Sequence, residues 1–479
     1  MPADPLQALP PHLARYAGVV GDARAFAEAL RRPLAQTLFT NTARLAPERL
    51  AEILGGTLSL QRLAWRPEAF RLAPEDRPGR HWSFTSGLYS VQEEASLLPV
   101  AMLDVRPGQR VLDLCAAPGN KTAQIALGLG NRGTVLANDL KTGRLAALHD
   151  LLRRMGLVNV STTGHDGCVY PVPDESFDRI LVDAPCTAEG KARRGHLRDS
   201  PPRFRRWVTG QQRGLLRRAI GLLRPGGRLV YSTCTFAPEE NEAVVTDLLA
   251  EFAGAVRVLA PAAELPGAAP GLEAWEGRMF HPDLHHARRL WPHLSDTGGF
   301  FAVALERGGT PDPVGAAPPP AAAQPSPGLR AQFDRFRVGD AELAELRFTA
   351  DDRHFRALAA DHAPPPGIAL ENTGLDIARR RARETKLSTP GAMALAQRAS
   401  GQVLDLDASE FAAWRARTTL RLPAGRVAAC DRGVLLVRHA GLVHGTGFLR
   451  LHPDGSGELE SQFPKAWMLG DLAMTADET

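Results

Sequence analysis

VLDLCAAPGNKT, residues 111–122, is the stretch that decides the fold. An apolar run typical of a buried strand passes directly into a turn of small residues, and a helix is expected from Lys121 onward. Small residues let the backbone approach a ligand, and the first turn of a helix offers N–H groups without partners. The stretch therefore predicts a strand, a ligand-binding turn and a helix in succession.

Strands and helices continue to alternate after this stretch. Strands are expected at 110–114, 134–138, 160–163, 179–182 and 228–231, and helices at 121–129, 142–155, 203–223 and 238–252. This alternation indicates a parallel sheet with right-handed crossovers and helices on both faces. Two last strands, at 256–259 and 301–305, are joined by a long loop and are expected to close the sheet as an antiparallel hairpin. The predicted fold class is α/β.

Composition sets outer bounds on the function. A chain of 479 residues is too long for one core, and 44% hydrophobic with 23% charged residues is typical of globular domains. The five cysteines form no C-x-x-C pair, which argues against a zinc ribbon and a disulfide framework and favours reduced thiols in the cytoplasm. We expect no metal, no signal peptide and no membrane span. The net charge of +4 permits nucleic-acid binding without proving it.

The turn and the next strand predict a nucleoside cofactor. Asp139, at the end of the second strand, is placed to accept hydrogen bonds from both ribose hydroxyls. The turn has only Gly119, and Pro118 stands where a pyrophosphate-binding glycine would lie, which disfavours NAD. S-adenosylmethionine, which has no phosphate, fits better; a turn without a ligand remains the alternative. Asp166 could reach the adenine, or could be an ordinary turn aspartate.

Two cysteines follow neighbouring strands. Cys186 ends the sequence DAPC after the fourth strand, and Cys234 lies in TCT after the fifth. Both are expected at the carboxyl edge of the sheet, where ligands bind in such folds. A lone buried cysteine is usually a small hydrophobe, and that interpretation is preferred for Cys168 and Cys430.

Methylation of cytosine at C5 supplies a reason for two thiols. A thiolate added at C6 makes C5 nucleophilic. After methyl transfer, a base must remove the C5 proton so that the thiolate can leave. The reaction is therefore covalent catalysis. Cys234, Cys186 and Asp183 fit the roles of nucleophile, release group and donor to the base. The residues themselves do not rank the two thiols.

Three motifs resemble the Nop/Sun family of RNA 5-methylcytosine methyltransferases. They are LDLCAAPGNKT (112–122), LVDAPCTAEG (181–190) and STCTFAPEENE (232–242), and GLYSVQEEASLLP (87–99) matches the family's lead-in. The match covers roughly 22–305. The C-terminal half is similar to the RsmF-type bacterial members, which carry a PUA-like module.

The resemblance implies a Rossmann-like S-adenosylmethionine methyltransferase sheet and assigns roles within it. It implies that Cys234 is the nucleophile and that Cys186 promotes product release. The positions that it implies for the cofactor are Cys115, Ala116, Ala117, Pro118, Gly119, Asn120, Lys121, Asp139, Asp166 and Asp183. The chain departs from the family at Asn120, where Gly or Ser is usual, and at Thr187-Ala188, where Ser-Gly is usual.

These observations divide the chain into five parts. The expected division is a ferredoxin- or RRM-like α+β RNA-binding unit at 1–80, the methyltransferase domain at 81–307, a Pro/Ala-rich linker at 308–330, a helix-rich domain at 331–402 and a PUA-like β-barrel RNA-binding domain at 403–479.

A basic segment after the DAPC motif predicts contacts with RNA. Between Lys191 and Arg218 there are ten Lys or Arg residues and one acid, Asp199. The residues expected to contact phosphates are Arg193, Arg194, Arg203, Arg205 and Arg206. A second cluster, Arg379–Arg381 with Arg383 and Lys386, is equally consistent with RNA binding and with a solvated helix.

The function expected from the sequence is methylation of cytosine C5 in RNA with S-adenosylmethionine. The resemblance to the RsmF-type members implies 16S rRNA or the small ribosomal subunit as the substrate. tRNA is the alternative substrate, and a non-catalytic RNA-binding scaffold is the alternative of another class. The target base must be unstacked to reach a thiol, so we expect single-stranded or locally opened RNA. The enzyme is expected to be a monomer.

Overall fold

The structure is a computed structural model that describes residues 9–310, 324–380, 385–397 and 399–468. Its centre is a mixed sheet with the order β11-β14-β15-β9-β8-β5-β6-β7-β18. Five of these strands are parallel: β5 (Arg110–Asp113), β6 (Thr134–Asn138), β7 (Val160–Thr163), β8 (Phe177–Asp183) and β9 (Leu223–Thr233). The α/β fold predicted from the alternation is confirmed.

One side of this sheet is antiparallel. β15 (Phe300–Arg307) runs antiparallel to β9, and β10 (Val256–Leu259) pairs antiparallel with β15. The predicted closing hairpin is therefore confirmed. Two short strands, β14 (Arg288–Leu290) and β11 (Ala269–Pro270), extend this edge.

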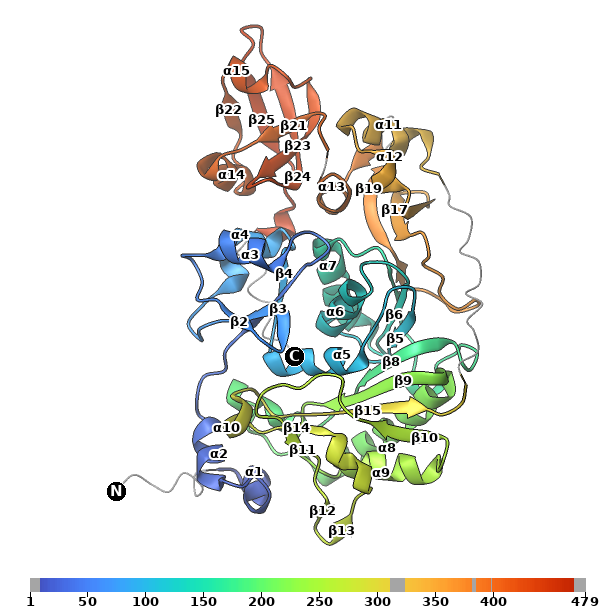
Figure 1. The fold of residues 1–479 in the computed structure, drawn as a ribbon. Helices are drawn as coiled ribbons and strands as arrows, with labels where there is room; N and C mark the ends of the chain where they lie inside the picture. Colours follow the sequence, from blue (N-terminus) through green and yellow to red (C-terminus); the bar gives the residue numbers. More distant parts are fainter. Residues whose placement is uncertain (1–8, 311–323, 381–384, 398, 469–479) are drawn as a thin grey trace, which may run out of the picture.

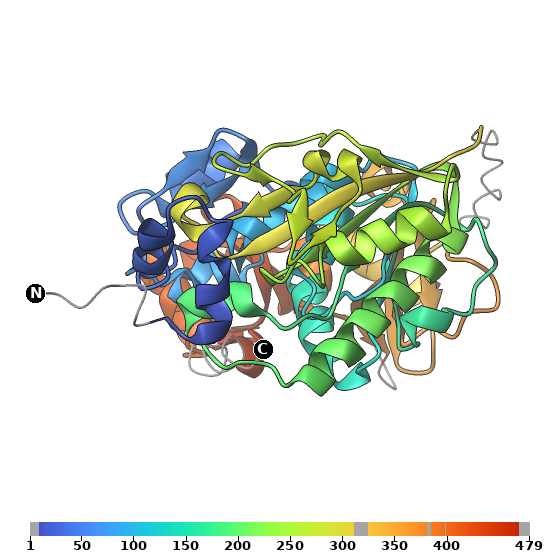
Figure 2. The same cartoon turned by 90° about the horizontal axis from the view of Figure 1, so that it is seen from below.

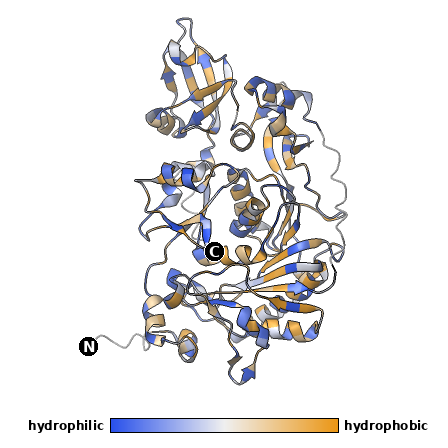
Figure 3. Ribbon diagram, viewed as in Figure 1, coloured by the Kyte–Doolittle hydropathy of each residue, from blue (hydrophilic) through white to orange (hydrophobic). Residues whose placement is uncertain are grey.

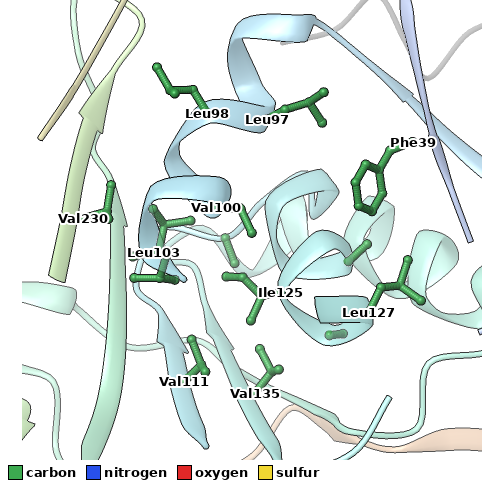
Figure 4. Close-up of a cluster of buried hydrophobic side chains, with 14 of the residues drawn as sticks. Phe39, Leu97, Leu98, Val100, Leu103, Val111, Ile125, Leu127, Val135 and Val230 are labelled. Carbon is green, nitrogen blue, oxygen red and sulfur yellow. The ribbon is translucent and has the colours of Figure 1, made fainter. Parts of the chain in front are cut away.

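Helices cover both faces of the central sheet (Figure 1). On one face lie α5 (Leu98–Leu103), α6 (Asn120–Gly128) and α7 (Leu145–Met155), and on the other α8 (Pro202–Leu222) and α9 (Glu242–Glu251). Successive strand residues point to opposite faces: Val111 packs with α5 and α6 (Figure 4), whereas Leu112 packs with α8 and α9. Each such fully buried side chain contributes about 1.5–3 kcal/mol. The strands are apolar on both faces, as a covered parallel sheet requires (Figure 3).

The N-terminal unit is a four-stranded antiparallel sheet with the order β2-β3-β1-β4. Its strands are β1 (Thr37–Thr40), β2 (Gln61–Leu63), β3 (Arg66–Arg71) and β4 (Tyr89–Gln92), and α3 (Pro47–Leu54) packs on it. Since β4 pairs with β1, the sheet continues past the expected boundary at residue 80.

The helices that precede this unit lie elsewhere. α1 (Pro11–Ala14) and α2 (Ala23–Ala29), with the single turn between them, pack against the methyltransferase domain (Figures 1 and 2). Phe26 of α2 contacts Phe236 and Trp291, both in loops beside the central sheet. α2 is capped by Asp22 and lies within the α+β unit expected at 1–80, but it does not pack on the four-stranded sheet.

The expectation of a helix-rich domain at 331–402 was wrong. Helices α11 (Pro327–Phe336), α12 (Asp340–Leu343) and α13 (Thr389–Leu395) flank an antiparallel sheet of β16 (Leu346–Ala350), β17 (His354–Ala359), β19 (Leu375–Arg380) and β20 (Thr385–Leu387). Sequence alternation is weak in these short strands, because β17 ends in three consecutive buried residues and β19 ends in two exposed arginines. β18 (Asn372–Thr373) pairs with β7 and joins this part to the central sheet.

The last part is a five-stranded sheet with the order β21-β23-β24-β25-β22. Its strands are β21 (Val403–Asp405), β22 (Leu420–Leu422), β23 (Gly433–His439), β24 (Leu442–Leu451) and β25 (Gly457–Ser461), flanked by α14 (Ala408–Arg415) and α15 (Ala424–Val427). It docks on the N-terminal unit through His444, whose Nδ1 lies 2.8 Å from Ser86 Oγ. Within the described ranges, no helix combines the length and apolar character needed to cross a membrane.

Candidate active site at the carboxyl edge of the central sheet

The turn after β5 is built to bring its backbone close to a neighbouring helix. Gly119 has φ +111°, and a Cβ on it would lie 2.3 Å from Leu148 Cδ1, so the position requires glycine. The amide of Ala116 donates to Asn138 O at 2.7 Å, which ties the turn to β6. Asn120 then begins α6, and the departure from the family at this position leaves the turn intact.

Asp139, predicted as the ribose ligand, closes this turn from the side. Its carboxylate accepts hydrogen bonds from the amide of Ala117 at 3.2 Å and from the guanidinium of Arg144 at 3.2 Å. Asp166 lies on an exposed loop at the same edge, where one of its oxygens accepts from the amide of Cys168 at 2.9 Å.

Carboxylates gather around Cys115. The pKa of this thiol is raised well above its ordinary value, first by burial and then by Asp113, Asp139 and Asp183. The sequence analysis did not single out Asp113, although a carboxylate inside an apolar strand is a usable signal. One of its oxygens accepts from Thr122 Oγ1 at 2.7 Å, the other is buried without a hydrogen-bond partner, and burial raises the pKa of its carboxyl to about 7.

This donor set fits a cationic ligand and not a pyrophosphate. With Asp166, four carboxylates face the turn against two cations, Lys121 and Arg144. A positive group placed beside Asp113 would favour its ionised form and give its unpartnered oxygen a partner. A sulfonium or an ammonium meets this requirement, whereas a diphosphate would be repelled.

Lys121 connects the cofactor turn to the second half of the site. Its ammonium lies 2.7 Å from Asp183 Oδ2, and Ser232 Oγ donates to the other oxygen of Asp183 at 2.7 Å. Burial disfavours the charged form of Lys121, but the Asp183 carboxylate outweighs this and raises its pKa. Asp183 is therefore fixed between the turn and the β9 strand end.

The structure brings the two predicted cysteines together. Cys186 Sγ and Cys234 Sγ lie 3.3 Å apart at the ends of β8 and β9, and both are free thiols. The expectation that both thiols share one edge of the sheet is confirmed. Cys168 and Cys430 lie elsewhere, and the pKa of Cys168 is raised to about 11 by burial and by Asp166, so neither has the character of a nucleophile.

The electrostatic surroundings of the two thiols differ. The hydrogen bond from Cys186 lowers the pKa of Cys234 in spite of its burial, and Lys191 and Lys121 lower it further. For Cys186, the hydrogen bond with Cys234, burial and the carboxylate of Glu240 all raise the pKa. The arrangement favours a thiolate at Cys234 with Cys186 as the hydrogen-bond donor.

A buried polar network holds the two cysteine loops in register. Thr187 and Thr235, each following a cysteine, join their hydroxyls at 2.8 Å. Glu240 accepts from the amide and the hydroxyl of Thr187, at 3.0 and 2.5 Å, and from Gln212 Nε2 at 2.9 Å. Thr187 keeps the hydroxyl of the serine that is usual at this position, and this hydroxyl ties the two loops together.

A second buried acid lies on the other side of this network. Glu189 accepts from Tyr16 of the N-terminal helical segment at 2.6 Å and from Thr235 at 3.3 Å. Burial raises the pKa of its carboxyl to about 7. Sequence patterns could not indicate this contact, because Tyr16 and Glu189 are 173 residues apart.

The predicted RNA-contacting arginines divide into two groups. Arg193 is 2% exposed, and its guanidinium donates to the carbonyl oxygens of Pro33 and Thr297, so it holds the loop and does not face a ligand. Arg205 pairs with Asp199 and lies 3.9 Å from Glu189.

Arg203 and Arg206 are exposed at the start of α8, and their guanidinium groups form no hydrogen bond or ion pair with the described part of the chain. Arg194 is 49% exposed, 3.4 Å from Glu93.

The second basic cluster lies at the end of β19. Arg379 and Arg380 are exposed on this strand and Lys386 lies in β20, so the helix expected there is absent. Arg381 and Arg383 lie outside the described residues. No three His, Cys, Asp or Glu side chains of the described ranges are grouped so as to hold a metal ion.

Comparison with known proteins agrees with this geometry. Residues 100–306 match the family model described as 16S rRNA methyltransferase RsmB/F. A ribosomal RNA small subunit methyltransferase F from Erwinia tasmaniensis is 31% identical over 411 residues, which is 80% of this chain and 81% of that protein. The protein of the same name from Salmonella paratyphi C is 38% identical over 294 residues, and that match spans 59% of each chain.

A solved structure has the same architecture. The methyltransferase homologue from Pyrococcus horikoshii superimposes with a TM-score of 0.56 at 32% identity, covering 64% of this chain and 98% of the other.

Proposed function

Because this chain belongs to the RsmB/F family of 16S rRNA methyltransferases, we propose that it transfers a methyl group from S-adenosylmethionine to C5 of a cytosine in 16S rRNA. The observation that carries the proposal is the thiol pair at 3.3 Å, beside a turn lined by carboxylates. A non-catalytic scaffold has no need of two half-buried free thiols with opposite pKa shifts at this edge.

S-adenosylmethionine would supply an electrophilic methyl group on a positively charged sulfur. The residues proposed to hold it are the turn from Cys115 to Lys121, with Asp139 for the ribose hydroxyls and Asp166 for the adenine amine. The excess of carboxylates at this edge supports a cationic cofactor.

Cys234 is proposed to attack the base. Its thiolate, favoured by Cys186 and Lys191, forms a bond with C6 of cytosine, and the electron pair of the C5–C6 double bond makes C5 nucleophilic. The carboxylate of Asp183, fixed by Lys121 and Ser232, would accept a hydrogen bond from the amino group of the base, and from N3 when N3 carries a proton. This contact would hold the base in place while negative charge develops in the ring.

Cys186 is proposed to assist the release of product. When a base such as a water molecule takes the C5 proton, the electrons of the C5–H bond reform the C5–C6 double bond, the C6–S bond breaks and Cys234 leaves as a thiolate. The thiol of Cys186, 3.3 Å away, donates a hydrogen bond to that leaving sulfur and stabilises its charge.

The flanking parts are proposed to bind RNA. The five-stranded C-terminal sheet would act as a PUA-like module, and the four-stranded N-terminal sheet as a ferredoxin- or RRM-like unit, with Arg194, Arg203 and Arg206 on the phosphates. We propose a monomer that works in the cytoplasm, where thiols stay reduced.

Methyl transfer can be tested with the full-length protein and methyl-labelled S-adenosylmethionine. We expect label in 5-methylcytosine of 16S rRNA or small subunits, detected by nucleoside mass spectrometry, and none with Cys234→Ala. Label in another nucleoside would contradict the chemistry, and label in tRNA alone would contradict the substrate.

A further inference from the structure

The first turns of α8 carry two exposed aromatic rings. Phe204 is 38% exposed and Trp207 is 53% exposed, and their ring centroids lie 5.6 Å apart at an interplanar angle of 34°. Among the large hydrophobic side chains exposed in the described ranges, these are the aromatic ones. Most aromatic residues of this chain are buried, as Trp291 and Trp414 are. Two adjacent exposed rings need an explanation other than core packing.

Cations surround the rings. Arg203 and Arg206 alternate with the two aromatic residues on the exposed turns of α8, and Arg198 lies in the exposed segment just before the helix. Within the described ranges, the guanidinium groups of these three arginines form no hydrogen bond and no ion pair. Arg205, by contrast, is neutralised by Asp199. The patch thus combines aromatic faces with uncompensated positive charge.

The course of α8 places the patch beside the active site. The helix leaves the carboxyl edge where β8 ends and runs to the start of β9 at the opposite edge. Gln212 Nε2 donates to Pro185 O at 2.9 Å, so this residue of α8 lies beside the loop that carries Cys186. Trp207 precedes Gln212 by five residues and therefore stands roughly 8 Å farther out along the helix axis, at about 1.5 Å per residue.

The contacts of α8 show which side of the active site lies next to Trp207. Gln211 and Gly214 touch Cys168, and Arg218 Nη2 donates to Tyr170 O at 2.8 Å. Trp207 is one turn before Gln211 on this same face, so it stands above the loop that carries Asp166. It is exposed because the helix there has passed beyond the loop.

We propose that Phe204 and Trp207 form a stacking platform for an unpaired base that flanks the target cytosine, with Arg203 and Arg206 on the adjoining phosphates. This inference rests on the proposed RNA substrate. Aromatic rings bind unpaired bases by stacking without regard to sequence, while arginines follow the backbone. A target base that has been flipped toward Cys234 leaves its neighbours unstacked, and the platform replaces the lost stacking.

Binding of a fluorescently labelled, unstructured RNA to the full-length protein tests the platform. Stacking of one base is worth about 5- to 100-fold in affinity, so we expect Trp207→Ala to raise Kd for this RNA by that factor and Trp207→Phe to restore most of it. Arg203→Ala should lower the slope of log Kd against log salt concentration by about 0.7. Met279→Ala is the matched control, since Met279 is 69% exposed and lies on another hairpin.

The outcomes separate this proposal from the proposed function. Wild-type binding of single-stranded RNA with no change in Trp207→Ala would overturn the platform and leave the methyltransferase proposal standing. A wild-type chain that binds no RNA at all would overturn both. If Trp207→Ala instead changed the oligomeric state in light scattering and left RNA affinity intact, the patch would be a protein interface. Unchanged binding of S-adenosylhomocysteine by calorimetry shows that the variant is folded.

Discussion

The two cysteine loops are alike in sequence and different in their surroundings. Each follows a parallel strand of the same sheet, and each places a threonine directly after its cysteine. Yet the ammonium groups of Lys191 and Lys121 lower the pKa of Cys234 against the opposing carboxylate of Asp183, whereas the carboxylate of Glu240 raises the pKa of Cys186. The comparison teaches that a short motif can place a thiol at the site, while residues distant in sequence set its protonation state.

The largest expected effect comes from removing each of the two thiols in turn. Cys234→Ala should reduce methyl transfer by roughly 10³-fold or more, because it removes the covalent nucleophile. Cys186→Ala should instead accumulate a protein–RNA adduct, since Cys234 still attacks but leaves slowly. Gel electrophoresis in SDS with labelled RNA and S-adenosylmethionine measures both.

Cys168→Ala is the control for these variants, because it removes a free thiol outside the pair. It should neither trap RNA nor stop turnover. An adduct that formed with Cys234→Ala and was absent with Cys186→Ala would reverse the assignment and show that the charge asymmetry does not select the nucleophile.

A smaller effect is expected from removing one of the cations that distinguish the loops. Lys191→Met should raise the pKa of Cys234, so less thiolate forms at neutral pH and the acidic limb of the rate profile moves to higher pH. A shift of about 0.5 to 1 pH unit would slow the reaction about 3- to 10-fold at pH 7. Single-turnover rates between pH 6 and 9 measure it.

Lys465→Met provides the matched control for that variant, because Lys465 is exposed on the last described helical turn. Its profile should coincide with that of the wild type. A Lys191→Met enzyme that lost rate equally at every pH would indicate a role in binding and not in ionisation.

The hydrogen bonds of the Thr187 hydroxyl should affect the rate of methyl transfer less than the free energy of unfolding. Thr187→Val keeps the shape of the side chain but removes the hydroxyl that bonds to Thr235 and Glu240. Leaving these buried partners unsatisfied should cost about 1–3 kcal/mol of unfolding free energy, measured with urea. Thr419→Val, at an exposed position, should change stability by less than about 0.5 kcal/mol.

The parts of this site that could be predicted are those written in contiguous sequence. The turn at 115–121 and the two cysteine motifs follow strands whose apolar runs and alternation with helices fix their edge of the sheet. The parts that could not be predicted depend on contacts between distant segments. Tyr16 on Glu189 is one such contact, and the burial of Arg193 beneath Thr297 is another.

The fold shows the same division. The alternation of strands and helices predicted the central sheet, because most of its strands contain a short apolar run and clear helices separate them. It failed at 346–380, where arginines interrupt short strands and the sheet is completed by pairing between segments. The boundary expected at 80 had the same weakness, since β4 joins β1 across about fifty residues of chain.

The smallest expected effect concerns the buried carboxyl of Glu189, which lies behind the two cysteine loops. Glu189 has a pKa raised by burial to about 7, above the value of about 4.5 expected in the unfolded chain. Its protonated form is favoured by folding, so the stability that it contributes is complete below pH 4.5 and is lost as the pH rises through 7. Glu189→Gln imitates the protonated acid and should therefore abolish this loss, making the variant about 1–2 kcal/mol more stable than the wild type at pH 8 and equal to it near pH 4.5. Thermal unfolding across this pH range measures the difference.

Methyl transfer should be nearly unchanged, because Glu189 contacts Thr235 and Tyr16 and not the thiols. A variant that was less stable than the wild type at pH 8 would mean that folding does not raise the pKa of Glu189, and that its carboxylate is stabilised in the fold as a charge.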